Sequence, residues 1–447
     1  MGAVVGVINS KNASRLAYYA LFSMQHRGQE ASGISVSFNH HIKTHKGLGL
    51  VNEVFNNEIL DNLKGDMAIG HNRYGTAGSK KMTDAQPISA NYLLGEISVS
   101  HNGNFTNSKE VKSELIKEGA IFHTNMDTEN IIHLIARSRK KHLKERIIEA
   151  LNVVKGAYCL IIMSRSKMFV IRDRYGIRPL SVGRLKDGGY IVVSETCAFD
   201  LVGASFVQDV EPGQMLIFEE GKDEFESVTL FSDTDPRICA FEYIYFARPD
   251  STVEGKNVYS VRKNLGKTLA QKSKTKADMV IPVPDSGVPA ALGYAQESGI
   301  PFEMAIVRNH YVGRTFIEPT QDMRNLKVKL KLNPMGKILN GKSIIVIDDS
   351  IVRGTTSKKI VELLRVAGAS EIHFKVAASE IKFPDIYGID TPTKEELISY
   401  KMSADEIRKY IGADSLEFLD INELVRAIGD NRKYSLVSFD GDYFAKK

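Results

Sequence analysis

The sequence is poor in cysteine, which limits how its fold can be held together. It contains three cysteines, Cys159, Cys197 and Cys239. None of them are paired at the spacing of a metal site, and an odd, sparse set argues against a disulfide framework. Cys159 lies within an apolar run, so we expect it to be a small buried hydrophobe.

Long apolar runs are also missing. No stretch approaches the roughly 18 apolar residues that a membrane-spanning helix needs. The N-terminus has no basic region followed by an apolar region, and a lipidation motif fails because Gly6 stands where Ser or Thr is required. We therefore expect a cytoplasmic protein with no membrane partner.

Neither sign of charge dominates. The chain has 59 basic and 54 acidic residues, a formal net charge of +5, and no long run of lysine and arginine. This balance gives no support to nucleic-acid binding. With 447 residues, 43% of them hydrophobic, the chain is long enough for two or three domains with full cores.

The two halves of the chain differ in pattern. The first half has short β-like segments, such as Ala3 to Ile8, with helical patterns between them, and this indicates a layered α/β fold. A polar, proline-containing segment at 231–236 marks a linker. In the second half, apolar runs such as Met279 to Pro282 and Ile344 to Ile347 alternate with helices, as in a parallel sheet.

The strongest chemical signal is the segment 344–356, in which a buried strand leads into two acids, a small polar loop and a helix. The start of a helix offers free N–H groups and a positive dipole end to a phosphate, and Gly354 allows close backbone approach. Asp348 and Asp349 do not themselves favour phosphate, and they make sense if they hold sugar hydroxyls or a divalent cation. A lone acid pair would favour a solvated strand end, but the whole pattern at the carboxyl end of a strand favours a ligand site.

This segment resembles the signature of type I phosphoribosyltransferases, which bind phosphoribosyl pyrophosphate. The resemblance implies that Asp348 and Asp349 bind the ribose hydroxyls and the metal site. The strand end at Asp285, Ser286 and Gly287 resembles the pyrophosphate loop of that family, in which Ser286 matches a magnesium-site position. The resemblance also implies that the 5′-phosphate is held by Arg353, Gly354, Thr355 and Thr356.

Two further segments, 239–251 and 308–317, are similar to segments of amidophosphoribosyltransferases. In that family the second segment is a flexible lid that closes over the substrate and helps to form an ammonia channel. Closure would exclude water from a reactive sugar cation.

The N-terminal half resembles a class II glutamine amidotransferase domain of the N-terminal-nucleophile type. The matching motifs are at 25–30, 72–76 and 101–104. A glutamine substrate needs a cation for its carboxylate, an anion for its amino group and donors for the oxyanion. The family positions for these roles match Arg73, Asp127 and the pair Asn102 with Gly103.

In that family a cysteine at the start of the mature chain attacks the amide, and its own α-amino group takes the proton. The matching position here is Gly2, which has no side chain. A deliberate substitution, a natural loss of activity or an inexact start of the sequence would each explain this, and the intact substrate-binding residues favour the first. We expect this chain to use free ammonia but not glutamine.

Some family members hold an iron–sulfur cluster with four cysteines. Cys239 matches one of these positions, Asp385 stands at the second, and Ser435 and Ser438 occupy the spacing of the last two. One thiolate cannot hold a four-iron cluster. We therefore expect Mg²⁺ as the cofactor and no iron–sulfur cluster.

Together these patterns predict an α/β protein of two domains. The resemblance implies an N-terminal-nucleophile αββα sandwich over residues 1–235. It implies a doubly wound phosphoribosyltransferase domain with a helical C-terminal tail over residues 236–447. The implied reaction forms 5-phosphoribosylamine from phosphoribosyl pyrophosphate and ammonia, taken from glutamine in the family, in the first step of purine synthesis.

Two alternatives remain open at this point. One is a phosphoribosyl transfer to a different acceptor, because the acceptor pocket cannot be read from the residues. The other is a degraded enzyme that binds phosphoribosyl pyrophosphate or nucleotides as a regulatory protein. The family also implies homodimers or homotetramers and inhibition by purine nucleotides.

Overall fold

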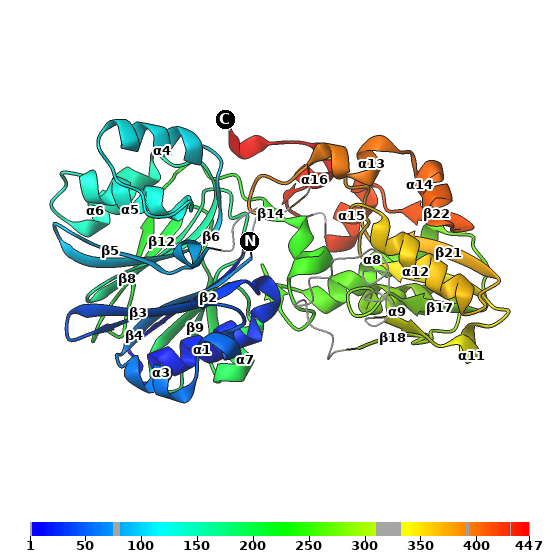
Figure 1. Cartoon of the computed structure of the whole chain (residues 1–447), viewed down its shortest axis with the longest axis horizontal. Helices are drawn as coiled ribbons and strands as arrows, with labels where there is room; N and C mark the ends of the chain where they lie inside the picture. The colour runs from blue at the N-terminus through cyan, green and yellow to red at the C-terminus, as the bar shows by residue number, and fades with distance from the viewer. Residues whose placement is uncertain are drawn as a thin grey trace.

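The computed structural model describes residues 2–74, 81–309, 332–389, 391, 393–429 and 431–446. These residues form two lobes that lie side by side, and the N-terminus lies between them in this view (Figure 1). Within the described ranges, no helix has both the length and the apolar character that crossing a membrane requires.

The first lobe contains a seven-stranded antiparallel sheet whose centre includes the N-terminal strand. Four helices accompany it, α1 (Ala13–Ser23), α2 (Val51–Val54), α3 (Asn57–Asn62) and α7 (Cys197–Val202). In spatial order the strands are β11 (Ser205–Asp209), β9 (Ser181–Arg184), β10 (Tyr190–Val193), β1 (Gly2–Ile8), β4 (Met67–Arg73), β2 (Ala31–Phe38) and β3 (His41–Leu48).

A second antiparallel sheet of six strands packs against the first. Its helices are α4 (Ser108–Lys117), α5 (Thr128–Arg137) and α6 (Leu143–Leu151). In spatial order its strands are β13 (Glu226–Thr229), β12 (Gln214–Glu219), β8 (Lys167–Arg172), β7 (Gly156–Ser164), β6 (Gly95–Phe105) and β5 (Ile88–Tyr92).

Alternation along the strands creates the layers of this lobe. On β1, Val5 packs into a cluster with the residues of α1, whereas Val4 packs into a cluster with residues of β7 and β8 in the other sheet. Successive side chains of a strand point to opposite faces, so β1 is buried on both. The resulting order of layers is helix, sheet, sheet, helix, which confirms the predicted αββα sandwich.

The second lobe is built on four parallel strands in the spatial order β17-β20-β21-β22. The strands are β17 (Met279–Pro282), β20 (Ser343–Asp348), β21 (Glu371–Val376) and β22 (Ser415–Phe418). The helices are α8 (Val258–Lys272), α9 (Val288–Ser298), α11 (Gly336–Leu339), α12 (Thr355–Val366), α13 (Ile398–Lys401), α14 (Ala404–Ile411), α15 (Ile421–Ile428) and α16 (Val437–Asp440).

The chain reverses its direction across this sheet between β17 and β20. From β17, helix α9 leads outward to Phe302, which bridges Val280 in β17, whereas α12 leads from β20 toward β21 on the other side. Parallel crossovers are right-handed, so α9 and α12 cover opposite faces, and ligands bind at such a reversal. This arrangement confirms the predicted doubly wound fold.

Short elements connect these units. Three two-stranded pairs are formed by β14 (Ile238–Cys239) with β23 (Tyr434–Ser435), β15 (Thr252–Val253) with β16 (Lys256–Asn257), and β18 (Ile306–Arg308) with β19 (Leu332–Pro334). A π-helical segment, η3 (Glu242–Phe246), follows β14. The 3₁₀ turns are η1 (Gln25–Arg27), η2 (Met82–Asp84), η4 (Lys394–Glu396) and η5 (Phe444–Lys446).

Buried charges join the two lobes. Arg27 of the first lobe donates through both terminal nitrogens to the carboxylate of Glu242 in η3, each at 2.9 Å, and also contacts Glu195. Arg178 lies 3.4 Å from Glu242 Oε1, which also accepts from Arg27 Nη2, and 3.7 Å from Asp385. All five side chains are almost fully buried, so each charge depends on its partners.

We predict that Gly266→Ala destabilises the second lobe. The two long helices α8 and α9 approach so closely that a Cβ at Gly266 would lie 1.8 Å from the carbonyl oxygen of Ala290. Because backbone atoms must shift to admit it, we expect a loss of about 2–3 kcal/mol in the free energy of unfolding, measured by urea denaturation.

Gly336→Ala is the matched control. A Cβ there would lie 3.5 Å from the nearest heavy atom, the oxygen of Ala367, which is ordinary contact. We expect this variant to change stability by less than about 1 kcal/mol. Equal effects of the two substitutions would contradict the close helix approach.

Candidate functional site

Two acids occupy the carboxyl end of β20. Asp348 and Asp349 are only 6% and 8% exposed, and neither forms an ion pair with a lysine or arginine among the described residues. Burial, and next the charge of Asp349, raise the pKa of Asp348 well above its ordinary value. Two hydroxyl groups, those of Ser286 and Ser350, each donate a 2.6 Å hydrogen bond to Asp349. The pair therefore has no cation in direct contact among the described residues, and the guanidinium of Arg262 acts on Asp349 only at longer range.

The sheet register brings the predicted pyrophosphate loop to these acids. Pro282 in β17 lies beside Ile347 in β20, so the residues that follow both strands meet at one edge. A Cβ at Gly287 would lie 2.4 Å from the oxygen of Ile347, so the approach requires glycine. Asp285 pairs with Arg308 and is more than half exposed.

The predicted phosphate loop leads directly into α12. Gly354 has φ of +72°, in the left-handed region, and caps the helix that begins at Thr355. Thr355 and Thr356 are exposed at the first turn, where the N–H groups have no helical partners. Arg353 is also exposed, but its guanidinium lies 3.3 Å from Glu396. The structure thus brings together all the predicted residues of this loop.

The second predicted site surrounds the first residue of β1. The backbone nitrogen of Gly2 donates to Asn102 Oδ1 at 2.9 Å, and its carbonyl oxygen accepts from Arg27 Nε at 3.2 Å. The other amide atom of Asn102, Nδ2, is buried without a hydrogen-bond partner among the described residues. An unpaired buried donor is what an oxyanion site requires.

Gly103, next in β6, has no room for a side chain. Its φ is +147°, and a Cβ would lie 2.1 Å from the oxygen of Ala157. Asn102 therefore lies beside Gly2, and the closely packed Gly103 follows it in the same strand.

The two charged residues predicted to bind glutamine both lie in this lobe. Arg73, the last residue of β4, is the ladder partner of Gly2 and lies 3.8 Å from Asp84. Asp127 precedes α5 and accepts a 2.9 Å hydrogen bond from the N–H of Phe105. Burial opposes the charge of Asp127, but the neighbouring His101 and hydrogen bonds from His101 and the backbone lower its pKa below the ordinary value.

Sequence reasoning missed two residues at this site. Arg27 lies in the motif at 25–30, but the sequence alone does not predict its contact with Gly2. Burial lowers the pKa of His71 to about 3, and a Cβ on Gly2 would lie 2.8 Å from its Nε2. Sequence alone does not show that a given histidine is buried and neutral, so nothing marked His71 in advance.

The four positions that match iron–sulfur ligands lie in the second lobe and are buried. Cys239 is the ladder partner of Ser435, and burial raises the pKa of its thiol to about 12. Asp385 accepts hydrogen bonds from the N–H groups of Tyr387 and Ile389. In the described part of the chain, no three His, Cys, Asp or Glu side chains form a metal-binding group. The expectation of no iron–sulfur cluster stays a prediction.

Parts of two predicted motifs lie outside the described residues. Of the predicted lid at 308–317, only Arg308 and Asn309 are described, and Gly75 and Thr76 of the 72–76 motif are not. The ammonia channel therefore stays a prediction.

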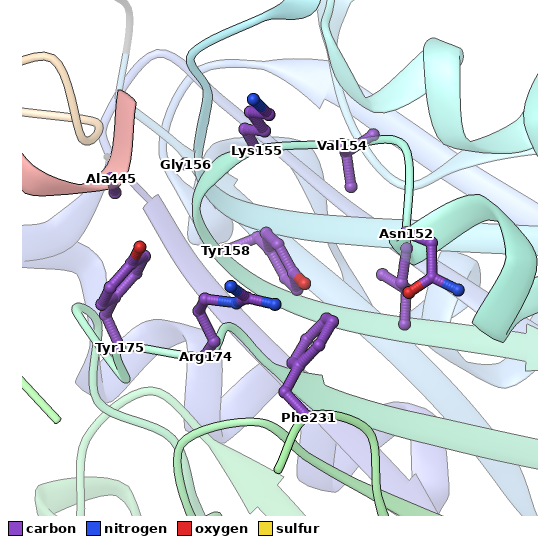
Figure 2. Close-up of a pocket in the computed structure, with 10 residues that line it drawn as sticks. Asn152, Val154, Lys155, Gly156, Tyr158, Arg174, Tyr175, Phe231 and Ala445 are labelled. Atoms are coloured by element: carbon purple, nitrogen blue, oxygen red, sulfur yellow. The ribbon is translucent and has the colours of Figure 1, made fainter. Parts of the chain in front are cut away.

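A separate cavity of about 130 Å³ lies elsewhere in the first lobe, beside the C-terminal turn (Figure 2). It includes Lys155, Tyr158, Arg174, Tyr175 and Phe231. None of the predicted site residues lines it, so it is not part of either site.

Comparison with known proteins identifies a family for each lobe. Residues 71–200 match the family described as glutamine amidotransferase domain, and residues 255–402 match the phosphoribosyl transferase domain family. The chain is 48% identical to amidophosphoribosyltransferase 1 of Arabidopsis thaliana, a chloroplastic protein, over 99% of this chain and 78% of that one. It is 47% identical to the amidophosphoribosyltransferase of Bacillus subtilis, over 98% and 93% of the two chains.

Solved structures give the same result. The structure of glutamine phosphoribosylpyrophosphate amidotransferase from B. subtilis, complexed with ADP and GMP, superposes with a TM-score of 0.93 at 45% identity, covering 99% of this chain and 97% of that one. A structure described as the allosteric regulatory enzyme of purine biosynthesis gives a TM-score of 0.95 at 46% identity, covering 99% and 96%.

We predict that Asp348→Asn stabilises the fold at pH 7. Because the pKa of Asp348 is raised in the folded state, the unfolded chain loses this proton first, and stability falls as pH rises between the two pKa values. Asparagine carries no charge and still accepts the N–H of Asp349. We expect an increase of about 1 kcal/mol in the free energy of unfolding, measured by urea denaturation without divalent cations.

Asp414→Asn should act in the opposite direction. Partial burial opposes its charge, but the N–H of Ile372 and the guanidinium of Arg365 lower the pKa of Asp414 below the ordinary value. Its charge therefore stabilises the fold above that pKa, and the variant should be less stable at pH 7. A loss of stability in Asp348→Asn would contradict the unbalanced charge of the acid pair.

Proposed function

Because this chain belongs to the amidophosphoribosyltransferase family, we propose that it forms 5-phosphoribosylamine from phosphoribosyl pyrophosphate and ammonia. This is the first step of de novo purine biosynthesis. The observation that carries the proposal is the reversal point of the parallel sheet, where the acid pair, a glycine-dependent loop and a helix N-terminus meet.

Each part of this edge suits one part of the substrate. We assign the 5′-phosphate to the turn before α12, where free N–H groups and two hydroxyls face it. We assign the ribose hydroxyls to Asp348 and Asp349, whose carboxylates accept hydrogen bonds. The pyrophosphate lies against the loop of Asp285, Ser286 and Gly287. The full phosphate-binding set is Arg353, Gly354, Thr355 and Thr356.

The residues present also fit Mg²⁺. Asp348, Asp349 and Ser286 supply hard oxygen ligands, and the raised pKa of Asp348 reflects a charge that a cation would balance. When bound, the ion would neutralise the pyrophosphate leaving group. In the reaction itself, the anomeric C–N bond forms as the C–O bond to pyrophosphate breaks, and the ammonium group loses a proton to water. No protein nucleophile is needed, because the loops hold the sugar in line.

We propose that the first lobe binds glutamine but does not hydrolyse it. Arg73 and Asp127 supply the charges for its carboxylate and amino groups, and Asn102 Nδ2 with Gly103 supplies the oxyanion site. The attacking thiol is missing at Gly2. Nitrogen would then have to arrive as free ammonia.

The missing thiol favours one second candidate, a regulatory protein that binds phosphoribosyl pyrophosphate without turning it over. An assay of ammonia-dependent pyrophosphate release separates the two candidates, because only an enzyme releases pyrophosphate. The intact acid pair and phosphate loop favour the enzyme.

Several wider proposals follow from family membership. We propose inhibition by purine nucleotides, in line with the relative that was solved with ADP and GMP. We also propose a homodimer or homotetramer that works in the cytoplasm. A division between residues 235 and 236 fits the strands, since β13 ends at Thr229 and β14 begins at Ile238.

We predict that the nitrogen source depends on residue 2. The protein with Gly2 should release pyrophosphate with ammonium but not with glutamine, and Gly2→Cys should gain glutamine-dependent release. Gly2→Ala is the matched control, because it adds the same Cβ without a thiol. The measurement is pyrophosphate release with each nitrogen source. Glutamine use at a comparable rate by the chain with Gly2 would refute the prediction.

A further inference from the structure

The residue at position 2 is held by side chains from two directions. Asn102 accepts from its nitrogen, and Arg27 donates to its carbonyl oxygen. Arg27 has no exposed surface, so the remaining contacts of its guanidinium fix its orientation. The position of the first residue of β1 therefore depends on what holds Arg27.

Glu242 holds Arg27 from the other lobe. Its two carboxylate oxygens accept from the two terminal nitrogens of Arg27 at 2.9 Å each. A bidentate pair fixes the plane of the guanidinium and therefore the direction of Nε. Glu195 also contacts Arg27, but it is shared with His26, the N–H of Arg248 and the hydroxyl of Ser251.

The segment that carries Glu242 is itself fixed within the second lobe. Arg262 of α8 donates to the carbonyl oxygens of Tyr243 and Ala247, at 2.8 and 2.7 Å. Glu242 also lies 3.4 Å from Arg178, which in turn contacts Asp385. A displacement of η3 would thus be transmitted to Arg27 and to the start of β1.

We propose that Glu242 is a positioning residue of the glutamine site, although it lies in the phosphoribosyltransferase half. It acts by orienting Arg27, which sets the carbonyl group of residue 2. Arg73, the ladder partner of residue 2, depends on the same strand end. This inference rests on the function proposed above.

The test compares two carboxylates that bridge the lobes, the buried Glu242 and the partly buried Glu254, in the Gly2→Cys background. Glu242→Gln keeps the shape of the side chain but removes its charge and one acceptor. Glu254→Gln is the matched control, because Glu254 pairs with Arg172 and Arg432 and has no contact with Arg27 or residue 2 among the described residues. Pyrophosphate release is measured with glutamine and with ammonium for each variant.

We expect Glu242→Gln to lower the glutamine-dependent kcat about tenfold, because a misplaced reacting group is costly. The ammonium-dependent rate and the KM for phosphoribosyl pyrophosphate should stay within about twofold, and Glu254→Gln should leave the ratio of the two activities unchanged. An unchanged ratio in Glu242→Gln, or an equal fall of both activities, overturns the proposal.

A second measurement covers the case in which Gly2→Cys regains no glutamine use. That result would count against the proposed function of the first lobe but leave the role of Glu242 open to calorimetry. Glutamine binding is then measured on the chain with Gly2, alone and with Glu242→Gln or Glu254→Gln. Weaker binding in Glu242→Gln alone supports the proposal, and equal affinity in both variants overturns it.

Discussion

The pairing of Arg27 with Glu242 is the contact on which the relation between the two lobes depends. Both side chains are completely buried, and each lies in a different half of the chain. A buried ion pair adds little net stability, but leaving one member unpaired costs about 3–5 kcal/mol. The two lobes are therefore restricted to arrangements in which Glu242 reaches Arg27. The same contact places the start of β1 next to the segment that enters the second lobe.

The acid pair at the end of β20 differs from the Arg27–Glu242 pair, because its charges have no cation in direct contact among the described residues. Hydroxyl groups, but no directly contacting cation from the part of the chain that the structure describes, surround Asp349, and burial raises the pKa of Asp348 above its ordinary value. A structural ion pair would have included a lysine or arginine. The unbalanced charge is useful only if a cation or a sugar hydroxyl arrives, so the residues that weaken the fold identify the site.

Local features could be read from the sequence because they depend on neighbouring residues. The strand up to Asp348, the left-handed Gly354 and the helix from Thr355 follow from hydrophobic pattern and backbone geometry within a few residues. The contact of Ser286 with Asp349 was not predicted as such, but it agrees with the rule that neighbouring parallel strands end at one edge. Arg27 and Glu242 are 215 residues apart, and each looks like a surface charge on its own. Such pairing depends on how two lobes meet, which no local pattern encodes.

The contacts around Gly2 explain how the amidotransferase site can keep its form without a nucleophile. Asn102, Arg27 and the ladder to Arg73 all engage the backbone of residue 2, and none of them uses a side chain there. The hydrogen bonds at this position are therefore made by backbone atoms, although a Cβ on Gly2 would lie 2.6 Å from the carbonyl oxygen of Asn72 and would require a local shift. In the function proposed above, a missing thiol removes the chemical step but leaves the strand, Asn102 and the charged residues in place. The proposed transfer of ammonia in the other lobe uses none of these atoms, so under that proposal the two chemistries are separable at one position.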